Sequence, residues 1–157
     1  MMSLLVCNLK PALFYHTNSD SPFLGAPNRK PIRDQLWWNQ GDQMRSWSSA
    51  FRSVAEFNDA FHALGNDLPN YKEADYYRSI RTAFPDLCEV CLTHTDLAPV
   101  NIILSMEVVG IIDWQESGWY PESWEYIKLR YHALEKWADA IEPYFGTTYE
   151  EEWEFFE

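Results

Sequence analysis

The sequence HTDLAPVN spans residues 94–101, and the sequence IIDW follows at residues 111–114. These two stretches carry the strongest indication of fold in the chain. Asp96 and Asn101 lie five residues apart in what we expect to be one loop, and Asp113 follows an apolar run. A carboxylate can accept a proton, and an amide oxygen is a neutral ligand for a hard cation such as Mg²⁺. The pattern therefore favours a site that combines a general base with metal ligands.

Phosphoryl transfer is the reaction that suits this combination. It needs an acceptor hydroxyl held in line, a carboxylate that takes its proton, and metal ions on the phosphate oxygens. Asp96 is suited to accept the proton, while Asn101 and Asp113 are suited to bind the metal. Because His94 has neither a nucleophile nor other metal-ligand residues beside it, we expect its ring to brace the loop through a hydrogen bond.

Two other interpretations of the same residues stay open. Asp and Asn cap turns and strand ends routinely, so each of Asp96, Asn101 and Asp113 taken alone is compatible with a purely structural role. A metal-dependent hydrolase using His94, Asp96 and Asp113 is the other alternative, although such sites usually contain more histidines. The order and spacing of the three residues, flanked by aliphatic strands, favour phosphoryl transfer over both.

The motifs resemble those of the aminoglycoside phosphotransferase-like kinases, particularly their fungal branch. The matching segments are H-x-D-L-x-P-x-N at 94–101, G-I-I-D-W at 110–114, G-W-Y-P-E-x-W-E-Y at 118–126 and F-x-S-V-x-E-F-N at 51–58. The resemblance covers roughly residues 47–150. It implies a protein-kinase-like fold and transfer of the γ-phosphoryl group of ATP to a small-molecule hydroxyl, with Mg²⁺ as the metal.

Position by position, the resemblance implies that Asp96 is the catalytic base and that Asn101 and Asp113 bind Mg²⁺. Three positions depart from the family pattern, which usually has Gly at Thr95, often His at Ala98 and often Glu at Gln115. Thr95 is the most awkward of these, because glycine adopts backbone conformations that a β-branched residue resists.

A kinase-like site also needs a Gly-rich loop over the phosphates and a strand lysine on them. None of the six glycines belongs to a G-x-G-x-x-G motif, and no apolar strand ends in a lysine within the first 50 residues. We therefore expect a C-terminal lobe with its N-terminal β lobe largely missing, so that the ATP site is incomplete and its residues are unknown. The alternative to an enzyme is an inactive lobe-only remnant that acts as a binding module.

The expected fold class is α+β, mainly α-helical, with a small β-hairpin at the catalytic loop. Residues 1–45 are rich in turn residues and are expected to be irregular, with Trp37 and Trp38 docking on the body formed by residues 46–157. Further expectations are a helix over residues 54–64 that Ser53 and Glu56 cap and Gly65 ends, a second helix over residues 71–83, a strand over 89–92, and hairpin strands over 101–104 and 108–112.

One long helix is expected from Pro121 to Pro143. Its apolar stripe steps by three or four residues through Trp124, Ile127, Tyr131, Leu134, Ala138 and Ile141. Four aromatic residues in or near this region suit either a substrate cleft or, more simply, the core: Trp119, Tyr120, Trp124 and Trp137. From Glu122 onward the chain contains ten acidic and three basic residues, and we interpret the acidic residues mainly as a solvated surface.

Composition limits the partners. The 157 residues carry a net charge of −12, which argues against a nucleic-acid partner, and no apolar run is long enough to cross a membrane. The start of the chain lacks the features of a signal peptide, and three cysteines do not make a disulfide framework, so we expect a cytoplasmic protein. Cys88 and Cys91 form an isolated C-x-x-C, which we interpret as two ordinary thiols.

Overall fold

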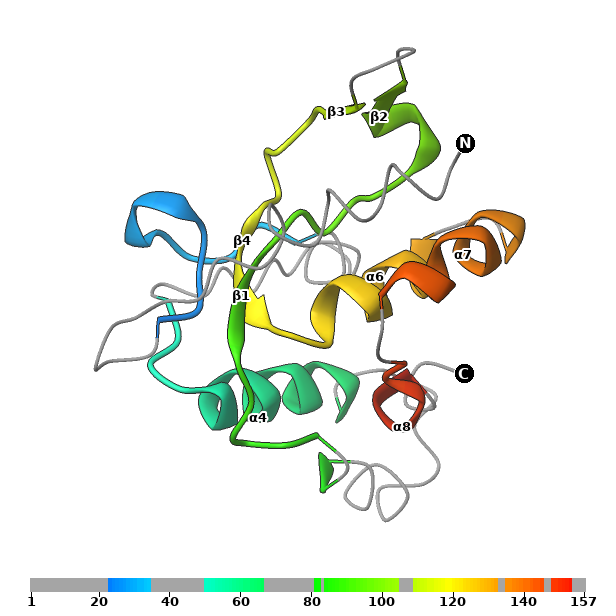
Figure 1. The fold of residues 1–157 in the computed structure, drawn as a ribbon. Helices are drawn as coiled ribbons and strands as arrows, with labels where there is room; N and C mark the ends of the chain where they lie inside the picture. The colour runs from blue at the N-terminus through cyan, green and yellow to red at the C-terminus, as the bar shows by residue number, and fades with distance from the viewer. Residues whose placement is uncertain are drawn as a thin grey trace.

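The structure, a computed structural model, describes residues 23–34, 50–66, 81–82, 84–104, 109–132, 135–145 and 148–153. Its elements are η1 (Pro27–Arg29), α4 (Val54–Asn66), β1 (Val90–Thr93), η2 (Pro99–Asn101), β2 (Ile102–Leu104), β3 (Val109–Ile111), β4 (Gly118–Pro121), α6 (Trp124–His132), α7 (Glu135–Ile141), η3 (Glu142–Tyr144) and α8 (Glu150–Trp153). Helices and two small antiparallel sheets make this an α+β fold, as expected (Figure 1).

The β1–β4 pair runs between the end of the molecule that holds α4 and the end that holds the β2–β3 hairpin (Figure 1). Its register runs from Val90 opposite Pro121 to Thr93 opposite Gly118. β1 lies one residue later than expected, and it ends at the residue before His94. The sheet therefore delivers the chain directly into the loop of residues 94–101.

Strand β4 was not predicted, because Pro121 was expected to open a helix. Pro121 is instead the last residue of β4. Proline has no N–H for a strand ladder, and both strands of a two-stranded sheet are edge strands, where that lack is tolerated. The following helix begins at Trp124, and the N–H of Ile127 donates to the carbonyl of Ser123.

The single long helix expected after Pro121 is also wrong. The structure describes two helices, α6 and α7, and Pro143 lies in the 3-10 turn η3 that follows α7. Tyr131, which the apolar stripe placed in the core, is 46% exposed. Every residue from 124 to 129 is buried, so α6 is enclosed on several sides and its polar residues face the interior with its apolar ones.

An aromatic cluster forms the main core. The ring of Phe57 on α4 meets Phe51, Tyr120 and Trp124 edge to face, with centroid distances of 5.5, 6.1 and 4.9 Å. Tyr120 and Trp124 stack on each other at 5.9 Å. Such pairs contribute beyond their buried area. The core interpretation of Tyr120 and Trp124 is thus confirmed, and Trp119 packs against the same cluster.

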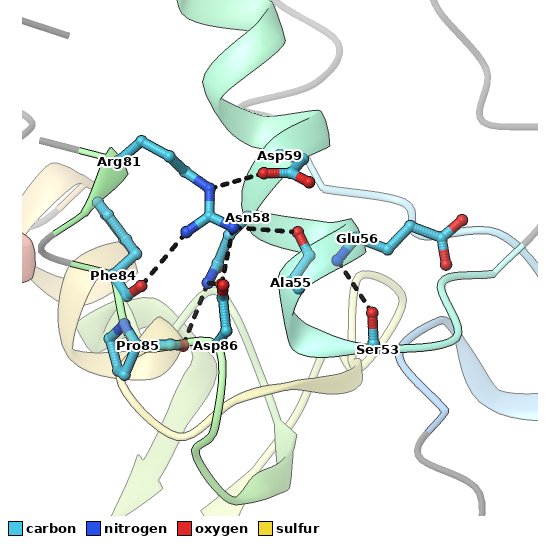
Figure 2. A network of polar contacts seen from close by, with 9 residues as sticks. All are labelled: Ser53, Ala55, Glu56, Asn58, Asp59, Arg81, Phe84, Pro85 and Asp86. Atoms are coloured by element: carbon cyan, nitrogen blue, oxygen red, sulfur yellow. Dashed lines mark hydrogen bonds and ion pairs between the residues drawn. The ribbon is translucent and has the colours of Figure 1, made fainter. Parts of the chain in front are cut away.

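The N-terminus of α4 has the predicted cap. The N–H of Glu56 donates to Oγ of Ser53 at 3.0 Å (Figure 2). The Glu56 carboxylate accepts from the N–H of Arg52 at 2.7 Å. The reciprocal bond reaches one residue further back than in a standard capping box. The helix ends at Asn66, one residue past the predicted stop at Gly65.

A polar network fastens α4 to the turn that precedes β1. The Arg81 guanidinium contacts Asp59 at 2.8 Å and Asp86 at 2.7 Å, and Figure 2 shows it lying between α4 and this turn. The Asn58 amide donates to Pro85 and Asp86 at 3.2 and 3.3 Å. Of the helix expected over residues 71–83, only Arg81 and Thr82 belong to the described part of the chain, and Arg81 is helical.

The β2–β3 hairpin confirms the prediction for this region. Ile102 pairs with Ile111, and Leu104 pairs with Val109. Ile102 and Ile111 pack against a second apolar cluster formed by Leu97, Leu129, Ala138 and Ile141. Residues 105–108, between the two strands, lie outside the described part. The second cluster anchors the base of the hairpin, where the candidate site lies.

The described N-terminal segment, residues 23–34, consists of the 3-10 helix η1, isolated β-bridges and irregular chain, and it is firmly packed. Gly25 exchanges two backbone hydrogen bonds with Trp119, and Leu24 exchanges two with Phe51. Leu24 belongs to the aromatic core. Trp37 and Trp38 lie outside the described residues, and the proposed division of the chain at residue 45 stays a prediction.

The two described cysteines are free thiols. Burial is the main cause that raises the pKa of Cys88 to about 11 and that of Cys91 to about 12. Both are therefore almost fully protonated at neutral pH, as expected for ordinary structural cysteines. In the part of the chain that the structure covers, no helix is both long and apolar enough to cross a membrane.

Gly118 provides a test of the sheet packing. A Cβ placed on Gly118 would lie 2.7 Å from the backbone carbonyl oxygen of Gly25, which cannot move without breaking its bond to Trp119. We expect Gly118→Ala to lower the free energy of unfolding by roughly 1–3 kcal/mol in urea titrations. Gly110→Ala is the matched control, because its nearest neighbour is 3.8 Å away. Equal stability of the two variants would contradict this packing.

Candidate active site

Asp96 and Asn101 meet at the two ends of one short loop. Nδ2 of Asn101 donates to the Asp96 carboxylate at 2.8 Å and to the Asp96 backbone carbonyl at 3.0 Å. The N–H of Asn101 donates to the carbonyl of Ala98, which closes the turn η2. Both side-chain hydrogen bonds use the amide nitrogen, so neither of them occupies the Oδ1 oxygen of Asn101.

Asp113 is brought back to this loop by the hairpin. The pairing of β2 with β3 continues for one residue, because the N–H of Ile112 donates to the carbonyl of Asn101 at 2.9 Å. Asp113 is the next residue, is exposed, and has a φ of 62°. Aspartate tolerates this left-handed conformation better than most residues. The three residues singled out from the sequence therefore lie at the base of one hairpin.

His94 joins the two halves of the site. Its Nδ1 accepts from the N–H of Asp96 at 3.2 Å, and its Nε2 contacts the carbonyl of Ile112 at 2.9 Å. These partners define a neutral ring with the proton on Nε2. Burial lowers the pKa of His94, which favours the same neutral form. The ring also meets Trp114 edge to face at 4.7 Å.

Glu125 binds the start of the loop through its carboxylate, a role that was not predicted from the sequence. Its carboxylate accepts the N–H of His94 at 2.5 Å and the N–H of Thr95 at 3.0 Å. Only 4% of Glu125 is exposed, although it was counted among the acids of a solvated face. Burial raises its pKa to about 7, and the two backbone donors act in the opposite direction. The available signal was its place in the W-E-Y motif of residues 124–126.

Thr95 adopts a left-handed backbone conformation, which a β-branched residue resists. Its φ is 71°, in the left-handed region that glycine occupies freely, and its side chain is buried. Its hydroxyl donates to the carbonyl of Glu116 at 3.3 Å. A non-glycine residue in this region costs roughly 1–2 kcal/mol. The contacts of Thr95 and the grip of Glu125 on its N–H hold the strained peptide in place.

Trp137, which the sequence assigned either to a substrate cleft or to the core, contacts the loop itself. Its indole N–H donates to the carbonyl of Leu97 at 2.7 Å. Leu97 itself is buried in the second apolar cluster. Trp137 thus fixes the middle of the loop at Leu97, the residue after Asp96.

The oxygen donors of the site suit Mg²⁺. Two acidic residues, Asp96 and Asp113, and the amide residue Asn101 lie at the hairpin base. Magnesium usually takes one or two protein carboxylates together with substrate phosphates, so it does not need an all-protein cage. Among the described residues, no three His, Cys, Asp or Glu side chains by themselves form a group able to hold a metal ion. Asn101 and Asp113 are the residues that would hold the metal.

The comparison with protein families agrees with this geometry. The model of the phosphotransferase enzyme family, APH, matches residues 22–157. This match spans most of the chain, and the chain therefore belongs to the phosphotransferase enzyme family. It includes the described N-terminal segment as well as the loop and the hairpin. Comparisons with curated proteins and with solved structures find no significant match.

The strain at Thr95 can be measured against a nearby threonine. Thr93 is equally buried but lies in strand β1. Thr95→Gly removes an unfavourable φ together with the side chain, whereas Thr93→Gly removes the side chain and adds backbone freedom. We expect Thr95→Gly to lower the free energy of unfolding by about 1–2 kcal/mol less than Thr93→Gly does. Equal losses in urea titrations would show that Thr95 carries no strain.

Glu125 should give the protein a characteristic pH dependence. Its folded-state pKa of about 7 lies above the ordinary value of 4.5, so between these values the folded state binds the extra proton. Its contribution to stability is present below pH 4.5 and is lost as the pH rises through 7, by up to about 3 kcal/mol. We expect Glu125→Gln to lack this fall and, at pH 5, where Glu125 is neutral, to be about 1–3 kcal/mol less stable than the wild type, because the amide nitrogen of Gln cannot accept an N–H group.

Urea titrations between pH 4 and 8 measure both effects. Glu150→Gln is the matched control, since Glu150 is exposed on α8. It should retain the pH dependence of the wild type. A Glu125→Gln variant with an unchanged pH profile would contradict the raised pKa.

Proposed function

We propose that this protein is an ATP- and Mg²⁺-dependent phosphotransferase that acts on a small-molecule hydroxyl, with Asp96 as its catalytic base. The observation that carries the proposal is the shared anchoring of Asp96 and Asp113. The ring of His94 binds the backbone of Asp96 through one nitrogen and that of Ile112, the neighbour of Asp113, through the other. Family membership supports the same reaction class.

In this proposal Asp96 receives the proton of the acceptor. The acceptor oxygen forms the new bond to the γ-phosphorus, the bond to the β-γ bridging oxygen breaks, and the hydroxyl proton moves to the Asp96 carboxylate. Asn101 orients that carboxylate by donating to one of its oxygens. Asn101 and Asp113 would hold Mg²⁺, which supplies charge neutralisation on the phosphate oxygens.

Three features make Asp96 well suited to this role. Its backbone N–H and carbonyl are both engaged, by His94 and Asn101, so the residue is held on both sides. Its side chain is only partly buried and can be reached by an acceptor. The loop is also fixed by Glu125, which accepts a hydrogen bond from the N–H of Thr95. Such pre-organisation is what general-base catalysis requires of a protein.

Within the family, we propose that residues 46–157 are the C-terminal lobe of a protein-kinase-like fold of the fungal branch. The hairpin at the loop, the four separated motifs and the helices after β4 support this assignment. The acceptor remains a small-molecule hydroxyl of unspecified class.

The hydrolase alternative is disfavoured by the geometry of His94. A metal ligand needs a free ring nitrogen, and both nitrogens of His94 are engaged by backbone groups. A catalytically inactive binding module is the second candidate. The six glycines of the sequence support it, since none belongs to a G-x-G-x-x-G motif.

Replacement of Asp96 tests the proposed function. With wild-type protein, Mg²⁺ and ATP, we expect phosphoryl transfer to a panel of small hydroxyl compounds, and Asp96→Asn should reduce it about 10²–10⁴-fold. Asp139→Asn is the matched control, because this carboxylate is 71% exposed on α7, and it should keep full activity. Equal rates for wild type and Asp96→Asn would refute the role of Asp96.

A thermal-shift titration separates the enzyme from the binding module. A ligand present at 100 times its dissociation constant adds about 2.7 kcal/mol to the stability of the folded state. Stabilisation by Mg²⁺-ATP without turnover would favour the binding module, whereas no shift at millimolar Mg²⁺-ATP would contradict nucleotide binding by this chain.

A further inference from the structure

Asp34 forms a buried charge pair far from its partner in sequence. Its Oδ1 lies 2.7 Å from Nζ of Lys128, and its Oδ2 accepts the indole N–H of Trp124 at 2.9 Å. Asp34 is 0% and Lys128 1% exposed. Both carboxylate oxygens therefore contact α6, which is reached here by the irregular segment that includes residues 31–34.

The two partners of Asp34 flank the residue that holds the loop. Trp124 and Lys128 are four residues apart and lie on one face of α6. Glu125 follows Trp124 directly and points its carboxylate at the N–H groups of His94 and Thr95. Asp34 thus binds one face of the first turns of α6. Glu125, in the same turns, binds the loop.

The charges also act on one another. Burial is the largest influence on the pKa of Glu125, and the nearby charges of Lys128 and Asp34 lower and raise it, respectively. A buried ion pair is often no more stabilising than apolar residues of similar volume, because the desolvation of two charges offsets their attraction. Stability by itself therefore does not account for this pair. What the pair does supply is one defined placement of α6.

We propose that Asp34 is a positioning residue for the loop of residues 94–101. By engaging Trp124 and Lys128 it sets the rotation and depth of α6, and thereby the place of the Glu125 carboxylate beneath the His94–Thr95 peptide. Only the description of this loop as catalytic depends on the proposed phosphotransferase function. The mechanical link between Asp34 and the loop stands on the contacts alone.

The decisive variant is the double substitution Asp34→Asn, Lys128→Met. It removes both charges together, whereas either single substitution leaves a buried charge without its partner and can prevent folding. The asparagine retains an oxygen for Trp124. The readout is the amide proton resonances of His94 and Thr95 in ¹⁵N-labelled protein, because short hydrogen bonds to a carboxylate shift such protons downfield.

We expect the folded double variant to show both amide protons moved upfield and exchanging with solvent about tenfold faster. Arg130→Gln is the matched control on the same helix, since it breaks the Arg130–Glu142 contact of 2.9 Å at a partly exposed position. It should leave both amides unchanged. A folded double variant with wild-type signals at His94 and Thr95 would overturn the proposal.

Lys128→Arg provides a second measurement if the double variant does not fold. It keeps the positive charge but replaces a compact ammonium with a planar group of different reach. We expect displaced His94 and Thr95 signals, and unchanged signals would count against the proposal. These readouts need no substrate, so an inactive wild-type protein would refute the proposed function without affecting this inference.

Discussion

The site depends on the capture of two backbone N–H groups by the buried carboxylate of Glu125. β1 ends at Thr93, and the next two residues donate to Glu125, which comes from a helix some thirty positions later. This contact joins the β1–β4 pair, the loop of residues 94–101 and α6. With His94 spanning from Asp96 to Ile112, it leaves little freedom for the loop that carries Asp96 and Asn101.

Two residues of the site accept unusual backbone conformations, and the structure holds each of them by different means. Thr95 is enclosed, with its N–H, its hydroxyl and its side chain all in contact with buried neighbours. Asp113 is exposed and depends on the hairpin pairing that ends beside it at Ile112. Strain of this kind persists only where the surrounding structure over-determines it.

Much of the local structure could be predicted because it arises from neighbours in the chain. The Ser53–Glu56 cap, the hairpin strands and the loop with Asp96 and Asn101 all follow from residue types at short spacing. The errors occurred where distant contacts decide. Strand β4 forms because β1 and Gly25 pair with it, and α6 accepts buried polar residues because Asp34 and the loop supply their partners.

The sequence by itself determined which side chains the candidate site offers: a carboxylate, an amide and a second carboxylate, in an order and spacing that resemble those of aminoglycoside phosphotransferase-like kinases. It also indicated that Thr95 stands where the backbone would suit glycine. Only the tertiary structure decided which acids are buried and what they hold. An acid such as Glu125 looks like any surface glutamate in sequence, because burial of a charge depends on hydrogen-bond donors that the fold brings from elsewhere in the chain.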